Sequence, residues 1–119
     1  MPLNPEKSTP PLAISATLPR VVMEHHEWEQ LASILKHHLP GRTVWAFGSR
    51  ARGKHVKRFS DLDLAVEGLE LTLLEAALLR EVFDECPLPF KVDIVQIESL
   101  TPEFRTRIEA EKVLLQGVE

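Results

Sequence analysis

The sequence predicts an α/β domain in which short apolar strands alternate with amphipathic helices. Three runs rich in apolar residues, 44–47, 62–66 and 92–97, have the length and the pattern of short strands. The segments beside them carry apolar residues every three or four positions, which is the period of a helix with one buried face. A chain of 119 residues fits one domain that buries roughly two thirds of its unfolded surface.

The first 20 residues are expected to form an extended or flexible arm, and the folded domain is expected to span 21–119. Five of the nine prolines lie in the first 19 residues, and proline removes a backbone donor and interrupts helices. The first helix is predicted from Glu24 to His38, because Trp28, Leu31 and Leu35 recur at helical spacing before Pro40 and Gly41 end the run.

The other elements follow from the same signals. A second helix is predicted over 71–86, where leucines recur three to four positions apart until Pro87 and Pro89. A third helix is predicted to begin after Thr101, a hydroxyl cap followed by Pro102 at the first helical position. We expect this helix to carry apolar residues as far as Leu115 and to end at Gly117.

Three aspartates stand out against the apolar strands. Asp61 and Asp63 are two positions apart, so they share one face of a strand about 7 Å apart, close enough to share divalent cations. Asp93 lies between Val92 and Ile94 in the next strand, and it joins the same cluster if the two strands pair in the right register. The alternative is that all three are solvated residues at strand ends.

A glycine and a serine precede this cluster at the end of the first strand. Gly48 allows backbone N–H groups to approach a phosphate closely, although a Gly48-Ser49 dipeptide by itself is more typical of a plain turn. Arg50 and Arg52 follow, and guanidinium groups match phosphate oxygens. Arginines on an exposed loop are as often only solvated, so both roles stay open at this point.

The ordered set of Gly48-Ser49, eleven residues, Asp61-x-Asp63 and Asp93 resembles the signature of the DNA polymerase beta-type nucleotidyltransferases. The stretch from Gly48 to Val66 is similar to the smallest members, the minimal nucleotidyltransferases (MNT), many of which are antitoxins of HEPN/MNT toxin–antitoxin pairs. The resemblance covers residues 44–97. It implies a small mixed sheet with helices packed on one face.

The resemblance also implies an activity. Asp61, Asp63 and Asp93 would be catalytic residues and ligands of Mg²⁺, in a site for two metal ions that also binds ATP. The triphosphate would be bound by the Gly-Ser motif and its two arginines: Gly48, Ser49, Arg50 and Arg52. AMP would pass from ATP to a hydroxyl, with tyrosine as the implied acceptor, of a cognate HEPN-family RNase toxin.

Two other functions are compatible with these residues. One is an antitoxin that neutralises its toxin by binding alone. The other is a small-molecule nucleotidyltransferase of the aminoglycoside-modifying type, which the short chain disfavours because it leaves no room for a second substrate-binding lobe.

The composition of the chain bears on its binding partners and on its location in the cell. A net charge of −4 argues against nonspecific nucleic-acid binding as the main task, since that normally needs a basic face. The single cysteine, Cys86, excludes an intramolecular disulfide and is compatible with a reducing cytoplasm, where we expect the protein to act. No apolar run approaches the roughly 18 residues of a membrane span, so no membrane association is expected.

Overall fold

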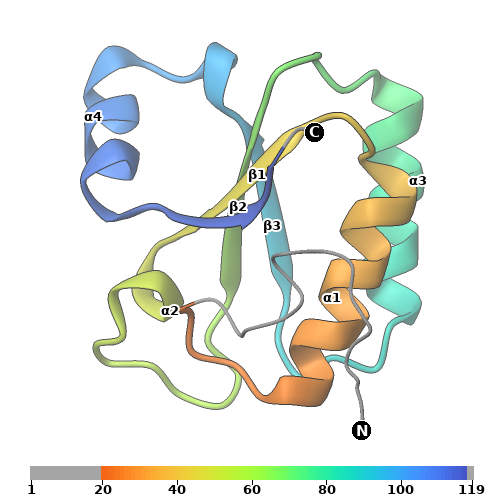
Figure 1. The fold of residues 1–119 in the computed structure, drawn as a ribbon, viewed down its shortest axis with the longest axis vertical. Helices are drawn as coiled ribbons and strands as arrows, with labels where there is room; N and C mark the ends of the chain where they lie inside the picture. Colours follow the sequence, from red (N-terminus) through yellow and green to blue (C-terminus); the bar gives the residue numbers. More distant parts are fainter. Residues whose placement is uncertain (1–19, 118–119) are drawn as a thin grey trace, which may run out of the picture.

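A four-stranded mixed sheet forms the centre of the fold (Figure 1). The computed structural model describes residues 20–117; residues 1–19, which are almost all of the expected N-terminal arm, and residues 118–119 lie outside the described part. The strand order is β3-β2-β1-β4, with β1 antiparallel to β2 and β4, and β2 parallel to β3. The strands are β1 (Thr43–Phe47), β2 (Leu62–Glu67), β3 (Val92–Gln96) and β4 (Val113–Gln116). The predicted α/β class with a small mixed sheet is confirmed.

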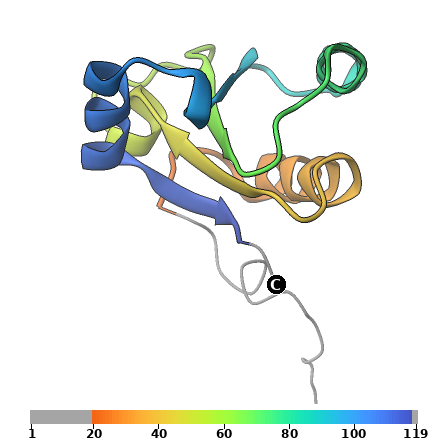
Figure 2. The same cartoon turned by 90° about the horizontal axis from the view of Figure 1, so that it is seen from above.

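Helices lie on both sides of this sheet (Figure 2). They are α1 (His25–His38), the short α2 (Ser49–Arg52), α3 (Leu73–Glu85), the 3₁₀ turn η2 (Ile97–Ser99) and α4 (Pro102–Glu111). The long helices α1 and α3 cover one face, as expected. The helix α4 departs from the expected arrangement with helices on one face: its apolar side packs on the other face, where Ile108 is buried with Phe47 and Ala65. No helix in residues 20–117 is both long enough and apolar enough to cross a membrane.

The main core lies between the sheet and the helices α1 and α3. Trp28, Leu31 and Leu35 of α1 are almost fully buried there. Alternate residues of β2, Leu62 and Leu64, are 0% exposed in the same core. Burying a leucine side chain contributes about 1.5–3 kcal/mol, so this alternation fixes which face of β2 is internal. The residue between the two leucines must therefore point to the opposite face.

The start of α4 confirms the prediction from sequence. Thr101 is the N-cap, its hydroxyl accepts a hydrogen bond from the backbone N–H of Phe104 at 3.2 Å, and Pro102 occupies the first turn. Such a cap stabilises a helix by about 1 kcal/mol.

The predicted end of this helix is wrong. The helix stops at Glu111, and residues up to Gln116 form β4, which pairs with β1. Ile108 and Leu115 are both buried, but in separate clusters on opposite faces of the sheet. Their seven-residue spacing matches two turns of a helix, and a short apolar run fits a strand equally well. Only the pairing with β1 distinguishes the two.

Candidate active site

The pairing of β2 with β3 sets two of the three aspartates side by side. Asp63 and Asp93 are direct partners in the parallel register, and neighbouring strands lie about 4.8 Å apart. Both face away from α1 and α3. The residues on either side of Asp63, Leu62 and Leu64, are buried under those helices, and Asp93 shares the face of Asp63 because the two are register partners. Asp61 precedes β2 and is exposed, and its charge reaches Asp63.

The electrostatics of Asp63 show that this group of carboxylates lacks a full counter-charge. Burial raises the pKa of Asp63, and the negative charges of Asp93, Asp61 and Glu111 raise it further, whereas Arg52 lowers it. Carboxylates held together in this way favour the arrival of a cation.

Gly48 lies against the same cluster. Its backbone has φ +81° and ψ −162°, a conformation found essentially only in glycine. A Cβ atom at this position would overlap Oδ2 of Asp63. Gly48 therefore allows the end of β1 to approach the carboxylate, and Ser49 follows it as the first residue of α2.

Arg50 corrects the expectation from sequence. Its guanidinium is buried, with 4% of the residue exposed, and it lies 4.1 Å from the centre of the Phe90 ring. It donates hydrogen bonds to the backbone carbonyls of Val22, Lys57, Arg58 and Ser60. Four of the five N–H donors of this guanidinium are used in these bonds and the Phe90 ring covers its face, so Arg50 is poorly placed to clamp a phosphate. Arg50 instead supports the loop that leads into Asp61.

Arg52 remains at the site, in contact with a residue that the sequence did not single out. Its Nη1 lies 3.1 Å and 3.2 Å from the two carboxylate oxygens of Glu111, the last residue of α4. Oε2 of Glu111 also accepts a hydrogen bond of 2.6 Å from the backbone N–H of Gly48. The helix dipole disfavours an acid in the last turn of a helix. Because the sequence predicts a helix as far as Gly117, however, it carries no signal that sets Glu111 apart.

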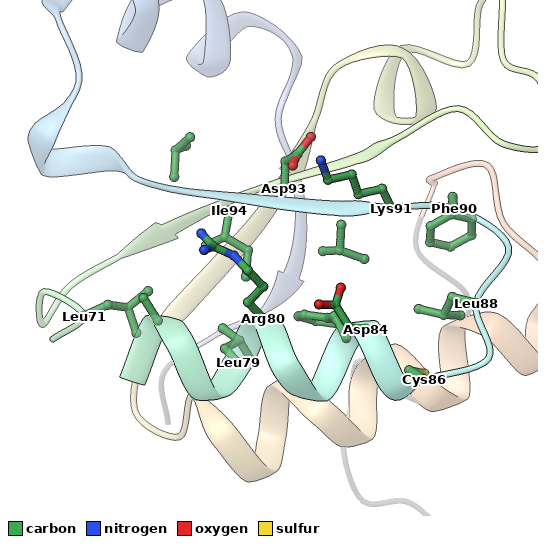
Figure 3. Close-up of a pocket in the computed structure, with 14 residues that line it drawn as sticks. Leu71, Leu79, Arg80, Asp84, Cys86, Leu88, Phe90, Lys91, Asp93 and Ile94 are labelled. Atoms are coloured by element: carbon green, nitrogen blue, oxygen red, sulfur yellow. The ribbon is translucent and has the colours of Figure 1, made fainter. Parts of the chain in front are cut away.

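A cavity of about 910 Å³ lies between α3 and β3 (Figure 3). Its lining includes Leu79 and Ile94, with Arg80 and Asp84 from α3 at its polar side. Figure 3 shows Ile94 directed toward α3 and Asp93 directed away from it. Asp93 lines the cavity, but its carboxylate belongs to the opposite face of the sheet. The cavity therefore does not open directly onto the aspartate cluster.

The donor set is suited to a hard cation. Carboxylate oxygens are the protein ligands that Mg²⁺ prefers, together with phosphate oxygens of a substrate. Within residues 20–117, no three His, Cys, Asp or Glu side chains already stand close enough to hold a metal ion by themselves. The chemistry of the residues fits Mg²⁺ if the remaining ligands come from a bound nucleotide.

Comparison with known proteins agrees with the fold and with the order of these residues. The family described as polymerase beta, nucleotidyltransferase, matches residues 29–117. The chain therefore belongs to the polymerase beta-type nucleotidyltransferase family. It is 42% identical, over 76% of its length and 82% of the relative's, to a Haemophilus influenzae protein named probable protein adenylyltransferase MntA.

Two solved structures share the fold. One, a minimal nucleotidyltransferase, is 36% identical with a TM-score of 0.56, over 73% of this chain and 87% of the other. The second is a tri-AMPylated Shewanella oneidensis HEPN toxin in complex with MNT antitoxin, matched with a TM-score of 0.60 and 19% identity over 81% of this chain and 74% of that one. At that identity the second comparison supports the fold alone.

The burial of Arg50 predicts a structural role that unfolding experiments can measure. Arg50→Ala should lower the free energy of unfolding by roughly 3–5 kcal/mol, because it removes four charge-assisted hydrogen bonds to backbone carbonyls and the buried contact with Phe90. The control is Arg58→Ala, whose side chain is exposed and should change stability by less than about 0.5 kcal/mol. If Arg50→Ala unfolds at the wild-type urea concentration but loses nucleotide affinity, Arg50 is a phosphate ligand after all.

The close approach of Gly48 to Asp63 predicts a second difference in stability. Gly48→Ala should cost more than the roughly 1–3 kcal/mol expected for its backbone conformation, because the new Cβ displaces Asp63. Gly53→Ala is the control for a positive φ without a clash: Gly53 has φ +76° in the left-handed helical region, which costs alanine less than the conformation of Gly48, and nothing lies within 4 Å of the place that its Cβ would take. Equal losses in urea unfolding would mean that the contact with Asp63 does not matter.

Proposed function

We propose that this protein transfers AMP from ATP to a hydroxyl group of a partner protein, a HEPN-family RNase toxin, and thereby neutralises it. The observation that carries the proposal is the pairing of Asp63 with Asp93 beside the Gly48 backbone. The 42% identical relative named a probable protein adenylyltransferase supports the chemistry. A structure that shares the fold is an MNT antitoxin in complex with an AMPylated HEPN toxin, and a toxin of this class is the partner that we propose by analogy.

Each residue of the site has a role in this proposal. Asp61, Asp63 and Asp93 would hold one or two Mg²⁺ ions together with phosphate oxygens of ATP. The metal, when bound, neutralises charge on the triphosphate and polarises the α-phosphate. The backbone N–H of Gly48, the hydroxyl of Ser49 and the guanidinium of Arg52 would bind the phosphate chain.

The transfer itself is an in-line displacement at the α-phosphorus. The acceptor hydroxyl oxygen forms a new bond to this phosphorus while the bond to the bridging oxygen of pyrophosphate breaks, and pyrophosphate leaves. The hydroxyl proton passes to the carboxylate of Asp93, which lies at the accessible edge of the cluster because β3 is the edge strand.

The surface favours a protein as the acceptor. Leu73, Leu74 and Leu78 of α3 are 93%, 68% and 48% exposed, and an exposed apolar strip is typical of protein–protein contacts. A small-molecule acceptor would need a pocket beside the carboxylates, and the cavity beside α3 lies across the sheet from them. A partner protein bound at α3 is large enough to extend past the edge strand β3 to the carboxylates. The free thiol of Cys86 fits the reducing cytoplasm that we propose as the location.

Loss of any one aspartate should stop the transfer. We expect Asp61→Asn, Asp63→Asn and Asp93→Asn each to slow transfer of label from ATP to the co-purified partner by at least about a hundredfold, since each removes charge from one catalytic unit. Asp84→Asn, an exposed aspartate of α3 outside the cluster, should keep the wild-type rate. Variants that transfer no label but still block toxicity in cells would favour neutralisation by binding alone.

The repulsion within the cluster should make the empty protein less stable than a neutralised variant. The raised pKa of Asp63 means that the folded protein binds this proton more tightly than the unfolded chain does, so ionisation at neutral pH costs stability. Asp63→Asn should therefore raise the free energy of unfolding in chelator at neutral pH, by about 1 kcal/mol. The gain should shrink as the pH falls through the pKa of Asp63.

Urea unfolding of both proteins measures this effect when it is repeated at a series of pH values from acidic to neutral, so that the titration of Asp63 is covered. A variant that is less stable than wild type across the whole range would show that Asp63 is held by stabilising contacts instead.

A further inference from the structure

Glu111 makes contacts that a nucleotide would also need. Its Oε2 accepts the hydrogen bond from the Gly48 backbone N–H, and both carboxylate oxygens accept from Arg52. The side chain is only 19% exposed, against 44% for Arg52. The carboxylate is therefore held within the site and is not a solvated residue at a helix end.

The position of Glu111 is electrostatically unfavourable except for these two contacts. It is the last residue of α4, where the helix dipole disfavours a negative charge. It also acts on Asp63, whose pKa rises further in its presence. The Gly48 N–H and the Arg52 guanidinium compensate for both effects, and charge-assisted hydrogen bonds are about twice as strong as neutral ones.

We infer that the Glu111 carboxylate occupies the place of a phosphate oxygen in the empty site and is displaced when the triphosphate binds. This inference rests on the proposed function. One backbone N–H has one hydrogen atom to donate, so Gly48 cannot bond fully to Glu111 and to a phosphate oxygen at the same time. A carboxylate left beside a polyphosphate would also repel it.

Glu111 therefore has two opposing effects. In the empty protein it keeps the Gly48 loop and Arg52 in the conformation that receives a phosphate. During binding it competes for both groups, which lowers the affinity for nucleotides whose phosphate chain reaches them. The competition selects among nucleotides: ATP must displace Glu111, whereas AMP, which lacks the terminal phosphates, has no need to do so.

Calorimetric titration of Glu111→Gln tests this competition. The glutamine keeps the shape and an acceptor oxygen but loses the charge, so Mg²⁺-ATP should bind about tenfold more tightly than to wild type. The affinity for AMP should change less than about twofold. Glu109→Gln is the control: it changes the net charge equally on the same helix, but Glu109 pairs with Lys112 and not with Gly48, and it should leave both affinities unchanged.

A measurement on the wild-type protein makes the test independent of how well the variant folds. The amide proton of Gly48 should give an NMR signal shifted downfield by its short bond to Glu111. A crystal structure with Mg²⁺ and a non-hydrolysable ATP analogue should show this N–H on a phosphate oxygen, with Glu111 turned away.

The outcomes separate this inference from the proposed function. If the wild type binds Mg²⁺-ATP while Glu111→Gln binds it equally or less well, or if Glu111 still bonds to Gly48 with the analogue in place, Glu111 only positions the loop and the displacement is wrong. If neither protein binds nucleotide, both the displacement and the proposed function are overturned. If Glu109→Gln also binds Mg²⁺-ATP more tightly than wild type, the gain comes from the change in net charge, and the displacement of Glu111 is wrong.

Discussion

The parallel pairing of β2 with β3 is the constraint on which the site depends. It sets Asp63 directly beside Asp93, and it does so because the alternate residues of β2 are committed to the core under α1 and α3. Two carboxylates forced together repel each other, and within residues 20–117 the charge of Arg52 offsets only part of this repulsion at Asp63. The repulsion between the carboxylates lowers the stability of the fold, and burial of apolar residues in the core offsets this loss. Such a trade between stability and a functional site is common in proteins.

The two arginines of the Gly-Ser motif have different tasks although they are only two positions apart. Arg50 turns inward and bonds to carbonyl groups of the loop before Asp61, while Arg52 turns toward the carboxylates and Glu111. The first arginine fixes the position of a proposed metal ligand, and the second already binds an anion, the carboxylate of Glu111. A loop of this kind can be exposed and basic and still hold its aspartate in a defined place.

The C-terminal part of the chain completes the proposed nucleotide side of the site. The helix α4 crosses the face of the sheet that carries the aspartates, and its last residue reaches Gly48 at the end of β1. The strand β4 then returns along β1 and anchors the helix through Leu115 in the main core. Glu111 is thus held between two elements that are both fixed to the sheet, so its carboxylate is presented to the Gly48 loop from a rigid support. The proposed acceptor has to come from outside, and the exposed leucines of α3 provide a surface for it.

The sequence by itself determined the α/β class, the helices α1 and α3, the three strands that carry or flank the motif, and the start of α4, because periodicity, proline and capping residues are local signals. It also determined which aspartates were candidates, since residues two apart on a strand share a face. It did not determine the fourth strand, because Val113 to Leu115 satisfies both a helical and a strand pattern until β1 lies beside it. The role of Arg50 and the presence of Glu111 at the site were decided only by the tertiary structure. Both depend on contacts between segments distant in the chain, from Val22 to Arg50 and from Gly48 to Glu111, and the identity of a charged residue does not reveal which partner it will meet.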